Sequence, residues 1–127
     1  MDVYQEIRER IKKYPNALLT EESYGLSVTP EGGFTVWIAS NDKYYSVGFE
    51  GWHEDFDSAE EALECFAWGL SNKCRLKIYN KGTNSYKWVT QSLENDEWEN
   101  VSTTCLLFFA FWKKSNIIYK QNNLITS

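Results

Sequence analysis

The amino-acid sequence predicts an α+β fold of two layers, in which a mainly antiparallel sheet of about six strands packs against two helices. Two segments show the helical period of 3.6 residues, and several others show the period of two that is typical of half-buried strands. Short connections between the strands favour antiparallel neighbours over crossovers. The expected order is a helix, three strands, a second helix and then three or four strands, α-β-β-β-α-β-β-β-β in its longer form.

The first element is expected to be a helix over residues 3–14. Asp2 is a suitable N-cap with Gln5 three residues later, and Pro15 ends the pattern. The apolar residues that recur at helical spacing are Val3, Tyr4, Ile7, Ile11 and Tyr14. Together they predict one apolar face that packs into the interior of the protein.

Three strands are expected between Tyr24 and Phe49, with turns at residues 30–33 and 41–42 between them. Alternate residues of a strand point to the same face of a sheet. The residues that share a face in the second and third strands are Phe34, Val36 and Ile38, then Tyr45, Val47 and Phe49. The pattern is typical of an antiparallel meander.

Residues 50–58 are interpreted as a polar and aromatic loop. The loop ends in a capping box, Ser58 to Glu61, which predicts the start of the second helix. The apolar side of this helix consists of Ala59, Leu63, Phe66 and Leu70, and Gly69 lies near its expected end.

A second hairpin is expected after this helix. Residues 73–79 alternate between apolar and polar side chains, and the sequence Asn-Lys-Gly at 80–82 turns the chain into a partner strand at residues 85–92. A polar turn is expected at residues 94–97.

The last part of the chain is expected to hold a strand at residues 105–112, a turn at 113–116 and a short strand at 117–119. Because residues 105–112 are strongly apolar, we expect this strand to be central in the sheet or covered by a second subunit. Residues 123–127 are interpreted as a frayed tail.

Both helices and the strands are expected to bury their apolar sides in a single interior. The residues predicted to meet there are Phe34, Val36, Leu63, Phe66, Leu76 and Ile78. At 127 residues the chain has the size of one domain, and no linker or repeat interrupts residues 1–127. The aromatic content of 17% gives large side chains to this core.

The composition excludes several classes of protein. The content of 43% hydrophobic and 24% charged residues is globular, which argues against a disordered chain. No apolar run approaches the roughly 20 residues that a membrane helix needs. The acidic, amphipathic start is unlike a signal peptide, so a cytoplasmic location is expected. The three cysteines form no CxxC pair and are expected to be reduced and buried.

Charge is distributed in blocks along the chain. Residues 50–64 hold seven acids and no Lys or Arg, whereas residues 73–87 hold five bases and no acid. The protein is therefore expected to be electrically polarised, which steers charged partners to one surface. Tyr79, Tyr86 and Trp88 accompany the basic block, but a pI near 4.9 and the lack of a recognition motif argue against nucleic-acid binding.

The leading functional hypothesis is a protein-interaction module, either for a protein partner, in the manner of an immunity protein, or for self-association. Trp and acidic side chains come together around the second helix, and Trp is enriched at protein interfaces. The candidate partner-binding residues are Trp52, His53, Glu54, Asp55, Glu60, Glu61, Glu64 and Trp68.

The alternative hypothesis is a small-molecule-binding or catalytic site around His53, the only histidine, and the neighbouring carboxylates. Adjacent residues seldom converge on one metal ion, so neither a metal nor another cofactor is expected. No nucleophile elbow, phosphate-binding loop or zinc-protease motif is present in the sequence. These observations favour an interaction protein over an enzyme.

Overall fold

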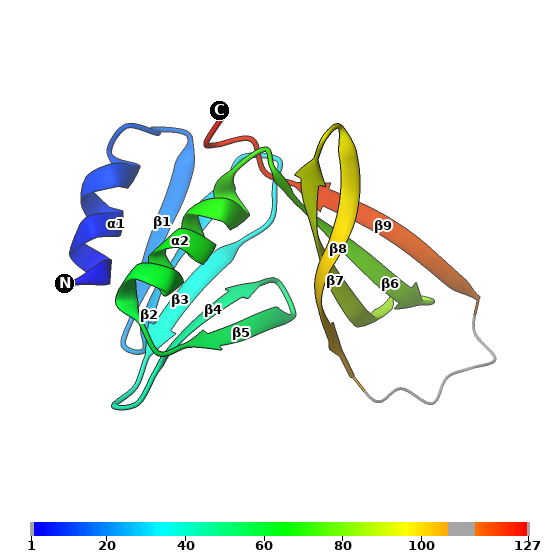
Figure 1. Cartoon of the computed structure of the whole chain (residues 1–127), viewed down its shortest axis with the longest axis horizontal. Helices are drawn as coiled ribbons and strands as arrows, with labels where there is room; N and C mark the ends of the chain where they lie inside the picture. The colour runs from blue at the N-terminus through cyan, green and yellow to red at the C-terminus, as the bar shows by residue number, and fades with distance from the viewer. Residues whose placement is uncertain (1, 107–113, 127) are drawn as a thin grey trace.

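The computed structural model describes residues 2–106 and 114–126, and in these residues two helices and nine strands form an α+β fold with two antiparallel sheets (Figure 1). The prediction of an α+β fold with two helices is confirmed. The single sheet of about six strands is wrong, because the strands divide into one sheet of five and one of four.

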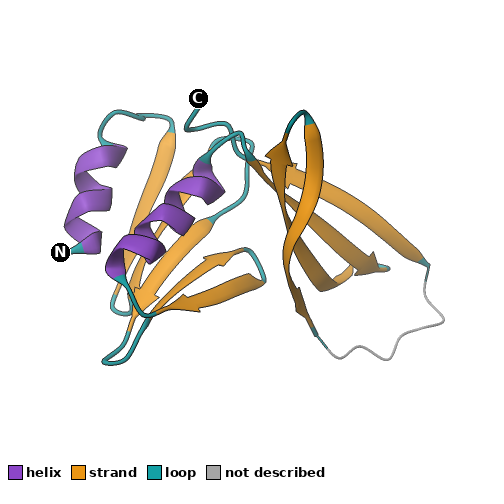
Figure 2. Cartoon of the chain, in the orientation of Figure 1, coloured by secondary structure: helices purple, strands orange, loops and turns teal. Residues whose placement is uncertain are grey.

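The first sheet is a meander in which each strand pairs with the next along the chain. Its strands are β1 (Ala17–Glu22), β2 (Gly25–Pro30), β3 (Val36–Ser40), β4 (Tyr45–Phe49) and β5 (Trp52–Phe56). The helices α1 (Val3–Ile11) and α2 (Ala59–Leu70) cover one face of this sheet (Figure 2). The predicted caps of both helices are confirmed, since the side chains of Asp2 and Ser58 accept hydrogen bonds from backbone N–H groups of the first turns.

The second sheet has the strand order β8-β7-β6-β9. Its strands are β6 (Cys74–Lys81), β7 (Asn84–Glu94), β8 (Glu97–Cys105) and β9 (Ser115–Gln121). The hairpin of β6 and β7 is confirmed. The expected turn at 94–97 is confirmed too, since Asn95 and Asp96 have φ of 52° and 66°, as a type I′ turn requires.

Two strands of the first sheet are missing from the sequence prediction. β1 reads Ala-Leu-Leu-Thr-Glu-Glu and does not alternate, so it has no strand signature. β5 lies within residues 50–58, which were expected to be a loop. It is an edge strand, and edge strands tolerate charged side chains because one edge of their backbone faces away from the sheet.

The predicted common interior is confirmed. All six expected residues belong to one buried cluster, which takes side chains from both helices and both sheets. Phe49 lies at its centre, with ring centroids 5.7 Å from Phe34, 4.5 Å from Trp52 and 5.8 Å from Trp68. The burial of these four rings joins the meander to α2.

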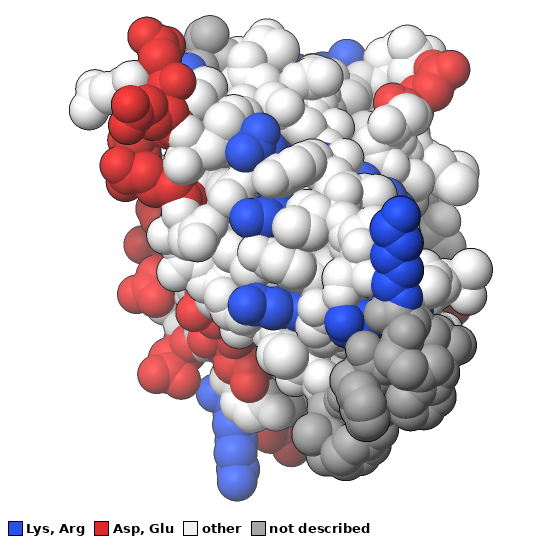
Figure 3. Space-filling view, turned by 90° about the vertical axis from the view of Figure 1, so that its right-hand side faces the viewer, with Lys and Arg blue, Asp and Glu red and all other residues white. Residues whose placement is uncertain are grey.

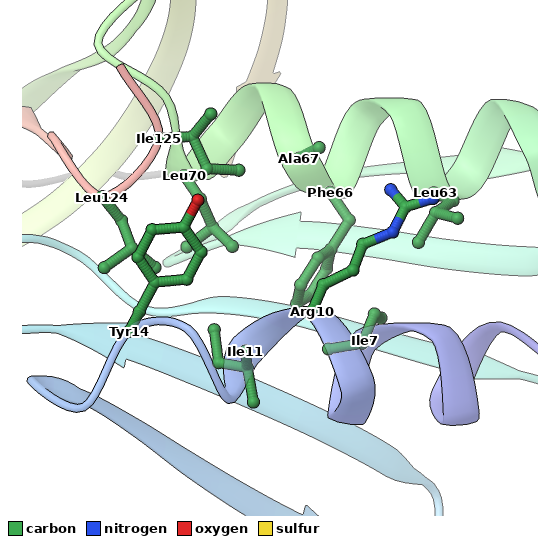
Figure 4. Close-up of a pocket in the computed structure, with 10 residues that line it drawn as sticks. All are labelled: Ile7, Arg10, Ile11, Tyr14, Leu63, Phe66, Ala67, Leu70, Leu124 and Ile125. Atoms are coloured by element: carbon green, nitrogen blue, oxygen red, sulfur yellow. The ribbon is translucent and has the colours of Figure 1, made fainter.

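The C-terminal residues dock on the protein, contrary to the frayed tail expected at 123–127. The backbone N–H groups of Leu124 and Ile125 donate to the carbonyl of Leu70, and Ile125 accepts from the N–H of Asn72. Leu124 and Ile125 also close the end of a narrow apolar gap of about 50 Å³ between α1 and α2 (Figure 4). Sequence position alone suggested fraying, but two apolar side chains with a place to pack prevent it in residues 123–126.

The strand expected at 105–112 falls mainly on residues 107–113, which lie outside the described residues. Its first residue, Cys105, ends β8 and is exposed, so the expectation that this thiol is buried is wrong. Within the described residues, no helix has both the length and the hydropathy to cross a bilayer.

Candidate functional site

An open groove with a volume of about 510 Å³ lies where β5 and α2 meet the hairpin of β7 and β8. We call it the acidic groove. Its lining residues are Trp52, Glu54 and Phe56 from β5, Glu61, Glu64, Cys65 and Trp68 from α2, and Ser92, Glu94 and Val101 from the hairpin. Three elements that are distant in the sequence thus contribute to one surface.

The periodicity of each element explains which side chains reach the groove. The three residues from β5 are at alternate positions, so they share one face of the strand. On α2, Glu61, Glu64 and Trp68 are three and four residues apart and therefore lie along one side of the helix. The Ser58 side chain accepts from the Glu61 N–H at 3.2 Å and fixes where this helix begins.

The floor of the groove is built on a buried tryptophan. Trp52 is only 1% exposed, its ring packs on Phe49, and its Nε1–H donates to the Ser102 hydroxyl at 3.2 Å. Beside it, Val101 is 59% exposed because it is the extra residue where the pairing of β7 and β8 shifts. The half-buried rings of Phe56 and Trp68, which line the groove around Trp52, and the projecting side chain of Val101 offer apolar contact to a ligand.

The rim of the groove carries negative charge without internal compensation. Four carboxylates line it, those of Glu54, Glu61, Glu64 and Glu94, and no Lys or Arg of residues 2–106 and 114–126 does. Among the described residues, none of the four forms an ion pair with a Lys or Arg. Uncompensated charge at a concave surface concentrates the electrostatic field and attracts cations.

The structure brings five of the eight predicted site residues together, namely Trp52, Glu54, Glu61, Glu64 and Trp68. The side chain of Trp52, one of these candidates, is buried as part of the floor.

The other three residues lie elsewhere. His53 and Asp55 alternate with the groove residues of β5 and are exposed outside its lining. Glu60 and Arg10 line a neighbouring depression, which shares Glu64 with the groove. Phe56, Glu94 and Val101 were missed. The alternation of β5 was a usable signal for Phe56, whereas nothing local in the sequence indicates that the β7–β8 hairpin approaches α2.

The geometry gives little support to the catalytic alternative. His53 does not line the groove, and its backbone N–H donates to the Thr104 hydroxyl at 3.4 Å. In the described part of the chain, no three His, Cys, Asp or Glu side chains are placed to hold a metal ion. Burial, with a smaller contribution from Glu54, raises the pKa of Cys65 to about 12, so the groove thiol is neutral and a poor nucleophile.

The thiols are expected to differ in reactivity. In the native protein at pH 8, a disulfide reagent such as DTNB should modify exposed Cys105 rapidly, and Cys65 and Cys74 only after unfolding, because burial raises the pKa of both. Counting the fast-reacting thiols by absorbance tests this, with urea-unfolded protein as the control. Rapid modification of all three native thiols would contradict the buried placement.

The same shifts predict a loss of stability in alkali. Thiols of the unfolded chain ionise near pH 9, whereas the folded Cys65 ionises near 12. Deprotonation therefore favours the unfolded state as the pH rises above about 9, by up to about 1.4 kcal/mol per pH unit for each thiol. Urea unfolding at pH 8 and pH 10, compared with a Cys65→Ala variant, measures this contribution. An equal fall in the free energy of unfolding of both proteins would show that ionisation of Cys65 is not the source of the loss.

Comparisons of the chain with protein-family models, with curated proteins and with solved structures find no significant match.

Proposed function

We propose that this protein is an interaction module whose acidic groove binds a basic segment of a protein partner. The observation that carries the proposal is the set of four carboxylates, without ion pairs to described Lys or Arg residues, around a floor of ordered aromatic rings. Lys and Arg side chains match such a surface, because their charged ends meet the rim and their methylene stems pack on the rings.

The shape of the groove favours a macromolecular ligand over a small molecule. Sites for small molecules usually enclose most of the ligand surface. Here the groove is broad and open, and its rim is assembled from a strand, a helix and a hairpin. A protein segment with an apolar side chain between two basic ones would contact the floor and the rim at once. Occlusion of a basic enzyme, as immunity proteins achieve, is one form of this function.

Charge reversal in the groove is expected to abolish partner capture. The double variant Glu54→Lys with Glu64→Lys changes two exposed rim residues that have no ion pairs to lose among the described residues. We expect the dissociation constant for a partner captured from a lysate of the source organism to rise at least about tenfold, and binding of the native protein to weaken with salt.

The matched control is the double variant Glu31→Lys with Asp42→Lys, which makes the same change in net charge at two exposed turn residues outside the acidic groove. It should retain the partner. Circular dichroism establishes that both variants fold. Equal retention of the partner by both double variants, or no salt-sensitive partner at all, would overturn the proposal.

A further inference from the structure

The second sheet has an outward face that is basic and aromatic. Along β6 the residues alternate, so Cys74, Leu76 and Ile78 are buried while Arg75, Lys77 and Tyr79 lie on the other side. In Figure 3 blue side chains lie over the middle and right of the face, while red ones line its left edge and form a small group at the upper right. Trp88, grouped with the basic block from the sequence, belongs to the buried cluster and is 8% exposed.

Arg75 is contacted on this face by residues of the other three strands of the sheet. Its Nε donates to Gln91 Oε1 at 2.6 Å, and the Gln91 amide donates in turn to Asn100 at 2.7 Å. The Arg75 guanidinium lies 4.6 Å from the ring centroid of Trp98 and 4.3 Å from that of Tyr119. These rings come from the two edge strands, β8 and β9, so the guanidinium is fixed before any ligand arrives.

The outer edge of this guanidinium is unused. Its terminal nitrogens Nη1 and Nη2 have no hydrogen-bond acceptor, and no carboxylate pairs with Arg75, among the described residues. Two parallel N–H donors on such an edge fit the two oxygens of a carboxylate.

Two lysines, Lys77 and Lys87, add positive charge to the same face beside Arg75. Lys77 is two residues from Arg75, and its Nζ lies 5.1 Å from the ring centroid of Tyr79; Lys87 from β7 lies 4.8 Å from the same ring. Neither lysine forms an ion pair with a described carboxylate. Successive side chains on one face of a strand are about 6.7 Å apart, which is also the repeat of alternate side chains in any extended segment.

We propose that this face binds an acidic, extended segment of a protein, with Arg75 holding one carboxylate through both terminal nitrogens and Lys77 or Lys87 pairing with the next. One observation favours such a segment over a nucleic acid. Cations already lie over the rings of Tyr79, Trp98 and Tyr119, which are therefore not free platforms for stacked bases. The proposal does not depend on the acidic groove.

The test is a titration of the full chain with a fluorescein-labelled peptide of ten residues, (Glu-Thr)₅, followed by fluorescence anisotropy. We expect saturable, salt-sensitive binding that weakens about tenfold in Arg75→Gln, and severalfold in Arg75→Lys, which keeps the charge but loses the two-pronged contact. Lys87→Gln should weaken binding by a smaller factor and is a second variant if Arg75 proves necessary for folding.

The control is Lys13→Gln, which removes one exposed positive charge that lies before β1 and makes no ion pair with a described carboxylate. Its affinity should equal that of the native chain. Absence of saturable binding, or equal affinities of Arg75→Gln and Lys13→Gln, would overturn the proposal. So would tighter binding of a 15-nucleotide oligothymidylate that depends on Arg75, since the face would then be a nucleic-acid site.

Discussion

Replacement of Asn122 by alanine is expected to lower the free energy of unfolding by about 3 kcal/mol, one of the two largest effects of any single change considered. Asn122 is 0% exposed, and its side chain accepts from the Phe34 N–H at 2.9 Å and donates to the carbonyls of Phe34 and Gly69 at 3.1 and 3.0 Å. One amide thus joins the C-terminal segment to the β2–β3 loop and to the end of α2.

The cost is large because alanine leaves three backbone groups without their partner in a place that water does not reach easily. Gly33 permits this arrangement, since a Cβ there would collide with the Asn122 amide oxygen. Urea unfolding measures the change, and Asn123→Ala, at the exposed neighbour, is the control, with an expected change within about 0.5 kcal/mol. A loss below about 1 kcal/mol for Asn122→Ala would mean that the three groups find other partners.

Replacement of Phe49 by alanine is expected to cost about 4 kcal/mol, because it removes the ring at the centre of the buried cluster and leaves a cavity. Phe49 is fully buried and contacts the rings of Phe34, Trp52 and Trp68. Gly69 also packs on its face, since a Cβ at that position would meet the Phe49 ring.

Phe49→Leu keeps most of the volume and should cost about 1.5 kcal/mol or less in the same urea experiment. The control is Tyr24→Ala, which truncates an aromatic residue that is 62% exposed and should change stability by about 0.5 kcal/mol or less. Comparable losses from Phe49→Ala and Tyr24→Ala would show that the four rings do not form the centre of the core.

The elements with a strong local signal were predictable from the sequence. Both helices have an oxygen-bearing cap followed by an apolar stripe, and β6 alternates before a glycine-containing turn that leads into β7. β1 and β5 lack such a signal, because β1 does not alternate and β5 carries three exposed polar residues in succession. The division into two sheets depends on which strands pair, and periodicity does not encode pairing.

The candidate groove was predictable only in part, because some of its residues are close together in the sequence and others are brought together by the packing of the two sheets. The acids of α2 follow a helical spacing, and Trp52 and Glu54 precede them closely in the sequence, so their proximity is local. Glu94 and Val101 reach the groove only because the second sheet packs beside β5 and α2. The fixed guanidinium of Arg75 is likewise a product of the strand order, which brings β8 and β9 to either side of the β6–β7 pair.

Hydroxyl-radical footprinting of the protein with its captured partner tests the central claim, that the acidic groove is the docking surface, most directly. We expect oxidation of Val101, Phe56 and Trp68 to fall when the partner binds, since all three line the groove and keep some exposure. Oxidation of Tyr24, which lies outside the acidic groove, should stay the same. Unchanged oxidation of the groove residues in a saturated complex would contradict the account.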